Sequence, residues 1–127
     1  MYLFVEGTPE SQGSKAIMRG RLIEGSGPKH KRLMAWRAHI RECLPPVVFD
    51  GPVAVELSFV FRRPKSAAKR EFMSVRPDVD KLCRAVLDAL TLKDGVGCLV
   101  EDSRVVRLKA EKVYGDVEGC WIRVVAL

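Results

Sequence analysis

Hydrophobic and polar residues alternate in several segments of the chain, which is the pattern of strands with one buried face. The clearest segment is 53–61, where Val55, Leu57, Phe59 and Phe61 fall on one face and the intervening residues on the other. Strands are also predicted at 2–6, closed by Gly7, and at 104–114 and 120–125. Two shorter extended pieces are expected within 16–24, around a turn at Arg19-Gly20-Arg21.

Two other segments repeat apolar residues at helical spacing. The first helix is predicted to begin at Ser26-Gly27-Pro28, with Ser26 as candidate N-cap, and to end before Pro45-Pro46. The second is predicted from Val79 to about Leu92, with Asp78 at its N-cap and Asp80 in its first turn, where the helix dipole favours an anion. The apolar stripe of the first helix comprises Leu33, Trp36, Ile40, Cys43 and Leu44.

This order of elements predicts an α+β fold, in which two main helices pack on one mixed, largely antiparallel sheet. The 127 residues contain no internal repeat or linker, so we expect a single domain spanning residues 1–127. No apolar run approaches the roughly 20 residues that cross a bilayer, and the N-terminus lacks the basic segment of a signal peptide. We therefore expect a cytoplasmic protein with no membrane partner.

The four cysteines do not form a CxxC pair. Cys43, Cys83 and Cys120 lie within apolar patterns, which favours buried thiols over zinc ligands. Cys98 lies in a glycine-rich turn, where both interpretations stay open.

The net charge of +6 is unevenly distributed. Residues 1–77 contain 14 Lys and Arg against 7 Asp and Glu, whereas residues 78–127 contain 8 against 9. A basic surface suggests a polyanionic partner, nucleic acid first, and ordinary solubilising charge is the alternative.

The segment 62–70, RRPKSAAKR, concentrates five basic residues and no acidic one, and we interpret it as a loop that binds phosphates. Its basic residues are Arg62, Arg63, Lys65, Lys69 and Arg70. The basic face of the first helix and the arginines at 19 and 21 are either DNA contacts or solvated surface. That helix face carries Lys29, Lys31, Arg32, Arg37 and Arg41.

Acidic residues gather around the second helix. Asp78 and Asp80 flank its start, and Asp102 follows a glycine-rich turn at the head of the next strand. Each is commonplace alone as a cap or turn residue, but carboxylate oxygens are also the ligands that Mg²⁺ prefers. Phosphodiester hydrolysis uses such a metal to neutralise the phosphate and activate water. Their coincidence with a basic loop predicts a magnesium site, with Mn²⁺ as a substitute ion.

These residues carry a resemblance to a known family. The blocks RPDVDKLCRAVLDAL (76–90), VEDSRVV (100–106) and AEKVYG (110–115) resemble the RusA family of Holliday-junction resolvases of bacteria and their phages. The resemblance implies a homodimeric, magnesium-dependent endonuclease that nicks paired strands of a four-way DNA junction, in recombination, repair or phage DNA processing within a bacterial cell. It places the catalytic, metal-binding aspartates at Asp78, Asp80 and Asp102.

The chain departs from the family pattern at two positions. Arg84 stands where the family has a catalytic lysine; an arginine can hold a phosphate but cannot act as a general base at neutral pH. Lys81 stands where asparagine is common in the family. We expect Lys81 and Arg76 to contact DNA. Glu101 is expected to be a further ligand or an outer-shell carboxylate that hydrogen-bonds to the ligands.

Three other functions fit the same patterns. A magnesium nuclease that cuts flaps, forks or single strands needs the same acidic residues, since these determine the chemistry and not the shape of the substrate. A non-catalytic DNA-binding module would use the aspartates only as caps and surface charge. A small interaction domain whose function does not involve nucleic acid would bind DNA only weakly and with little salt dependence.

Overall fold

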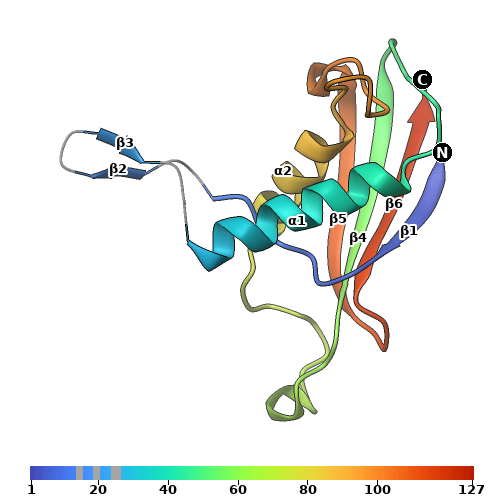
Figure 1. The fold of residues 1–127 in the computed structure, drawn as a ribbon. Coiled ribbons are helices and arrows are strands. Elements are labelled where there is room, and N and C mark those ends of the chain that lie inside the picture. Colours follow the sequence, from blue (N-terminus) through green and yellow to red (C-terminus); the bar gives the residue numbers. More distant parts are fainter. Residues whose placement is uncertain (14–15, 19–20, 24–26) are drawn as a thin grey trace.

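The computed structural model describes residues 1–13, 16–18, 21–23 and 27–127. Two helices lie on the same side of a four-stranded sheet (Figure 1). The sheet contains β1 (Tyr2–Glu6), β4 (Val53–Phe61), β5 (Val105–Tyr114) and β6 (Gly119–Ala126). The helices are α1 (Pro28–Cys43) and α2 (Val79–Leu90), and short 3₁₀ turns occur at Lys65–Ala67 and Asp102–Arg104. A separate antiparallel pair is formed by β2 (Ala16–Met18) and β3 (Arg21–Ile23).

The strand order β1-β6-β4-β5 explains the position of α2. β4 pairs antiparallel with β6 but parallel with β5, in a register that places Val53 beside Val105 and Phe61 beside Tyr114. A parallel pair needs a crossover connection, and α2 lies within the connection between β4 and β5. The sheet is thus mixed and largely antiparallel, and the predicted α+β fold is confirmed.

The hydrophobic core lies between the sheet and the helices. Phe59 and Ile122 of the sheet and Leu82, Val86 and Leu90 of α2 are fully buried there. Truncating one such leucine to alanine typically costs about 2–5 kcal/mol of stability. The amphipathic pattern of α2 therefore fixes which of its faces meets the sheet and leaves its polar flank at the surface.

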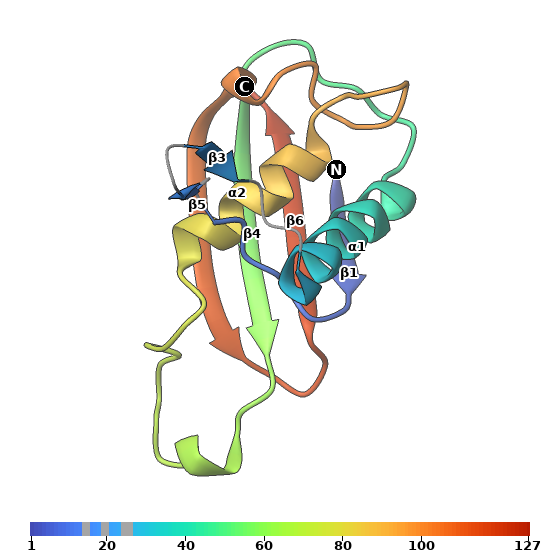
Figure 2. The ribbon, with the colours of Figure 1, turned by 60° about the vertical axis from the view of Figure 1, so that its left-hand side comes forward.

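Among the residues that the structure describes, no helix covers the other face of the sheet (Figure 2). Tyr2 and Trp121 stack on each other there, with ring centroids 5.3 Å apart. Arg123 and Glu56 form an exposed ion pair at 3.6 Å, which contributes little to stability.

Several predicted boundaries differ from the structure. The N-cap of α1 is Gly27 and not Ser26, which lies outside the described residues. The reason is steric, because the ring of Pro28 holds the preceding residue in an extended conformation. The helix α2 ends at Leu90, where the carbonyl of Leu90 accepts hydrogen bonds from the backbone of Cys98 and Leu99. The predicted turn at 19–20 also lies outside the described residues.

The prediction that Cys43 is buried was wrong. Cys43 is the last residue of α1 and is exposed, because the chain leaves the helix at Leu44, whose side chain packs against the core instead. The other three cysteines are buried, as predicted for Cys83 and Cys120.

Arg41, on the basic face of α1, has a structural role. Its guanidinium donates hydrogen bonds to the carbonyl oxygens of Ala89, Thr91, Lys93 and Val96, at 2.6–3.2 Å. It therefore fixes the end of α2 and the following turn against α1. In the part of the chain that the structure describes, neither helix is long and apolar enough to span a membrane.

Candidate active-site groove

A groove of about 400 Å³ lies between α2 and β5. The helix contributes Asp80, Arg84 and Asp88, which share one flank because they are spaced four residues apart. Asp102 completes the polar lining. The apolar lining consists of Val79, Cys83, Leu87, Leu108 and Ala110. The groove thus holds three carboxylates and one guanidinium beside an apolar wall, and Asp80 and Asp88 are about 12 Å apart along the helix axis.

Asp102 is positioned by the 3₁₀ turn that precedes β5. Arg104 fixes this turn, since its guanidinium donates to the backbone oxygen of Asp50 at 2.6 Å and to Glu101 Oε2 at 3.1 Å. Ser103 also donates to Glu101 Oε2, at 3.2 Å. Glu101 therefore stabilises the turn that carries Asp102 and does not line the groove itself.

Asp78 lies outside the groove. It occupies the N-cap position of α2 without making a side-chain capping bond, and its carboxylate is 3.3 Å from the ammonium of Lys81. Both side chains are about half exposed, so this ion pair is weak. Asp78 lines a neighbouring cavity of about 280 Å³, together with Ser11, Lys29, Arg76, Pro77 and Lys81.

The acidic residues fit a magnesium ion by their chemistry, but they do not form a closed cage. Within residues 1–13, 16–18, 21–23 and 27–127, no group of three or more His, Cys, Asp or Glu side chains is arranged to hold a metal ion. Magnesium is often held by only one or two carboxylates, with water and substrate phosphates as the remaining ligands. Asp80 and Asp102 can supply such carboxylates, and the three-aspartate set stays a prediction.

Asp88 is an acidic residue of the groove that the predicted site did not include. The side-chain amide of Gln12 donates a hydrogen bond to Asp88 Oδ2 at 2.6 Å, and the backbone N–H of Gln12 donates to the carbonyl of Lys81 at 3.0 Å. Arg37 approaches the amide oxygen of Gln12 at 3.5 Å. The N-terminal segment therefore crosses α2 beside the groove. The four-residue spacing of the polar residues on α2 was the signal in the sequence that could have identified Asp88.

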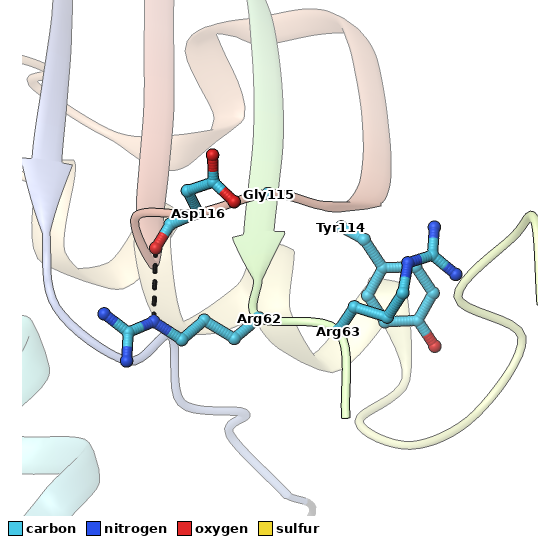
Figure 3. Close-up of a pocket in the computed structure, with 5 residues that line it drawn as sticks. All are labelled: Arg62, Arg63, Tyr114, Gly115 and Asp116. Carbon is cyan, nitrogen blue, oxygen red and sulfur yellow. Dashed lines mark hydrogen bonds between the residues drawn. The ribbon is translucent and has the colours of Figure 1, made fainter. Parts of the chain in front are cut away.

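The basic loop 62–70 follows β4 and borders a cavity of about 550 Å³ lined by Arg62, Arg63, Tyr114, Gly115 and Asp116 (Figure 3). The guanidinium of Arg63 lies 4.3 Å from the centroid of the Tyr114 ring and donates to the carbonyl oxygens of Ala67 and Arg70. Arg70 in turn donates to the Tyr114 hydroxyl at 3.1 Å. Arg63 and Arg70, both predicted to bind DNA, thus hold the loop in shape.

The remaining basic residues of this loop face solvent. Arg62 donates through Nε to the carbonyl of Asp116 at 3.1 Å, and its terminal nitrogens point away from that bond (Figure 3). Lys65 and Lys69 are exposed. These three cations are free to meet phosphates.

The basic loop and Asp102 lie at opposite ends of β4. The loop leaves β4 after Phe61, whereas Asp102 precedes the start of β5, which pairs beside Val53. A nine-residue strand spans about 26 Å. The chain returns from the loop to the start of α2, where the ammonium of Lys112 donates to the carbonyls of Val75 and Pro77. The loop therefore adjoins the groove at its Asp80 end and extends beyond the sheet (Figure 1).

The buried cysteines have raised pKa values. Burial, with a smaller effect of the Asp80 charge, raises the pKa of Cys83 to about 11, and burial raises the pKa of Cys98 to about 11. The pKa of Cys120 is also raised, first by burial. Thiols with such pKa values stay protonated at neutral pH, which disfavours them as nucleophiles.

A carboxylate-lined groove beside a cationic loop, on a basic α+β domain, is an arrangement suited to enzymes that act on phosphodiesters. The chain belongs to the RusA endodeoxyribonuclease family, because the family model described as Endodeoxyribonuclease RusA matches residues 7–125. The family predicted from the sequence is thereby confirmed. A comparison with curated proteins found no match.

Proposed function

We propose that this protein is a structure-specific endodeoxyribonuclease that resolves four-way DNA junctions by paired nicks, in recombination, repair or phage DNA processing. The observation that carries the proposal is the groove between α2 and β5, which Asp80, Arg84 and Asp102 line in a member of the RusA family. A groove lined by carboxylates and a guanidinium can both hold a divalent metal and receive a phosphate.

Asp80 and Asp102, with Asp78, would hold Mg²⁺ or Mn²⁺. When bound, the ion supplies charge neutralisation at the phosphate and activation of a water molecule. Asp78 has to leave Lys81 to join the other two carboxylates. Breaking the Asp78–Lys81 pair costs little because both side chains are about half exposed.

The guanidinium of the groove positions the scissile phosphate. Arg84 donates hydrogen bonds to a phosphate oxygen and, being permanently charged, does not take a proton. In the reaction, the oxygen of water forms a bond to phosphorus and the bond from phosphorus to the 3′ oxygen breaks. The water gives up one proton to solvent or to a carboxylate of the groove, and the leaving 3′ oxygen takes one proton from solvent. The products are a 5′-phosphate and a 3′-hydroxyl.

DNA is expected to approach the groove from the Asp80 end. Arg62, Lys65 and Lys69 contact backbone phosphates from the loop, and Arg76 and Lys81 do so beside Asp78. Symmetric nicking of a junction needs two such sites related by a two-fold axis, so the active species is a homodimer.

The decisive experiment is cleavage of an end-labelled synthetic four-way junction in Mg²⁺, with matched duplex, flap, fork and single strand alongside. Wild type is compared with Asp80→Asn, and the mass of the protein in solution is measured at the same concentration. We expect the protein to be a dimer and to make paired nicks in the four-way junction and in no other substrate. Asp80→Asn should bind the junction but not cut it.

The alternative functions give different results in the same assay. Preferential cutting of flaps or forks identifies a nuclease for other branched DNA, because the groove chemistry does not depend on branch shape. Binding without cutting in Mg²⁺ or Mn²⁺ identifies a non-catalytic module. Normal cutting by Asp80→Asn contradicts the assignment of the groove.

A further inference from the structure

Phe72 is the most exposed large hydrophobic side chain in the part of the chain that the structure describes. Its exposed fraction is 73%, against 65% for Tyr2. Tyr2 stacks on Trp121, whereas Phe72 stands in the segment that connects the basic loop to the start of α2. An apolar ring in this position costs free energy in water unless a partner covers it.

The backbone around Phe72 is held in place on both sides. The next residue, Met73, is buried and belongs to the hydrophobic core. Before Phe72, Arg63 donates to the carbonyl of Arg70; after it, Lys112 donates to the carbonyl of Val75 at 2.6 Å. The ring is therefore presented to solvent by an anchored segment.

The surroundings of Phe72 suit a nucleobase. Cations of the loop precede it, and the aspartates at the start of α2 follow it. Val75, between these two groups, and Val79, between Asp78 and Asp80, are also partly exposed, at 42% and 37%. Cations match the phosphates of DNA, whereas an exposed aromatic ring matches the flat face of a base. The structure thus places an apolar contact between a phosphate-binding loop and the acidic groove.

We propose that Phe72 stacks on a base exposed at the branch point of the DNA substrate and so distinguishes branched from linear DNA. The inference rests on the proposed function and adds a residue that recognises the branch point, which the nuclease chemistry alone does not identify. In a continuous duplex both faces of a base pair are covered by its neighbours, whereas bases at a point of strand exchange can be uncovered. Stacking of one base on an aromatic side chain is worth about 1–3 kcal/mol, or about 5- to 150-fold in affinity.

The test uses the full chain with Asp80→Asn, so that binding is measured without cutting. Phe72→Ala and Phe72→Trp are compared for affinity to a four-way junction and to a duplex of the same arms. The matched control is Tyr2→Ala, which removes another exposed ring, from β1, the sheet edge farthest from β5. A junction with 2-aminopurine at the branch point, and a second with it within an arm, reports stacking by fluorescence quenching.

We expect Phe72→Ala to weaken junction binding at least 5-fold, to leave duplex binding unchanged and to abolish quenching at the branch point. Phe72→Trp should retain the junction affinity and the quenching at the branch point. Tyr2→Ala should behave like the Asp80→Asn protein without a second substitution. Equal losses on junction and duplex, or unchanged quenching in Phe72→Ala, would overturn the proposal. Thermal unfolding of each variant verifies that the fold is intact, as expected for so exposed a residue.

Failure of this inference is distinguishable from failure of the proposed function. If the protein with Asp80 intact cuts junctions and Phe72→Ala does not change junction preference, the stacking proposal is wrong and the nuclease stands. If the protein cuts no DNA but prefers junctions through Phe72, the nuclease is wrong and the stacking site stands.

Discussion

Gln12 and Asp88, 76 residues apart in the chain, are joined by a hydrogen bond of 2.6 Å from the Gln12 amide to Asp88 Oδ2. The bond fixes one carboxylate of the groove and attaches the N-terminal segment to α2. A hydrogen bond to a charged group typically contributes about 1.5–3 kcal/mol, and less where water competes for it, as at this partly buried position.

Gln12→Leu should therefore destabilise the protein by about 1 kcal/mol at pH 7, and Gln12→Glu by more. The glutamate places a second carboxylate against Asp88, and the repulsion raises the pKa of one of the pair. Protonation of that carboxylate relieves the repulsion, so the Gln12→Glu defect should shrink as the pH falls from 7 to 4, whereas the Gln12→Leu defect should not. Urea unfolding at several pH values measures both. Parallel pH profiles for the two variants would show that Gln12 does not meet Asp88.

Asp78 provides a test of whether the groove recruits a carboxylate from outside. We expect Asp78→Asn to reduce junction cleavage at least 100-fold, because the magnesium site loses a ligand, while thermal stability changes little at this exposed position. Lys81→Ala is the matched control, since it removes the ion pair but keeps the carboxylate. It should weaken DNA binding modestly without abolishing cleavage. If Asp78→Asn cuts at the wild-type rate, Asp78 is not a metal ligand, and the catalytic carboxylates are only those that line the groove.

Adjacent arginines of the basic loop should behave differently. Arg62→Ala should weaken binding of every DNA tested and lower the slope of log affinity against log salt by about 1. Stability should change little, because the single bond from Arg62 to Asp116 is exposed to water. Arg63→Ala should destabilise the protein by about 1 kcal/mol, because it removes the contact with Tyr114 and the bonds to the loop carbonyls. Affinity across a salt series and urea unfolding separate the two effects. If Arg63→Ala lowers the salt slope with stability unchanged, Arg63 binds DNA directly.

The fold could be predicted from the sequence because its signals are local. The alternation in 53–61 and the helical stripe beginning at Val79 each define a buried face, and packing these faces together leaves few arrangements. The spacing of Asp80, Arg84 and Asp88 on one flank of α2 could also be read directly. These features needed no knowledge of contacts between distant residues.

The parts that could not be predicted depend on such distant contacts. The sequence does not distinguish Arg62, which faces solvent, from Arg63, which stacks on a tyrosine 51 positions later. Nor does it show that Asp78, two residues from Asp80, lines a different cavity. Residue type indicates which chemistry is available, and tertiary packing decides which residues carry it out.

Arg41 was grouped with the basic face of α1 by its spacing, yet its guanidinium donates to four carbonyls at and beyond the end of α2. Two of these carbonyls would otherwise lie unpaired at the negative end of the helix dipole. Arg41→Ala should therefore destabilise the protein by about 2–4 kcal/mol and leave the salt dependence of DNA binding unchanged. Lys31→Ala, an exposed cation on the same helix, is the control and should be neutral in stability. Equal stability of the two variants would show that the Arg41 bonds contribute little.

The cysteines give a prediction about pH. An ordinary thiol has a pKa near 9, but burial raises that of Cys83 to about 11, so at pH 8 it forms about 100-fold less thiolate. Iodoacetamide at pH 8 should modify Cys43, which is exposed, and leave the three buried thiols intact. Mass spectrometry of digested protein shows which cysteine is modified, and the same reaction in urea should modify all four.

The raised pKa values also predict how stability depends on pH. Between about pH 9 and 11 the unfolded chain releases thiol protons that the folded protein still holds, so the free energy of unfolding should fall as the pH rises through this window. Cys83→Ala removes one such group and should make the fall shallower, although the variant starts from a lower stability because of the small cavity it creates. Urea unfolding from pH 8 to 11 measures both slopes. Identical slopes for wild type and Cys83→Ala would show that Cys83 titrates normally, and modification of Cys83 at pH 8 would then be expected as well.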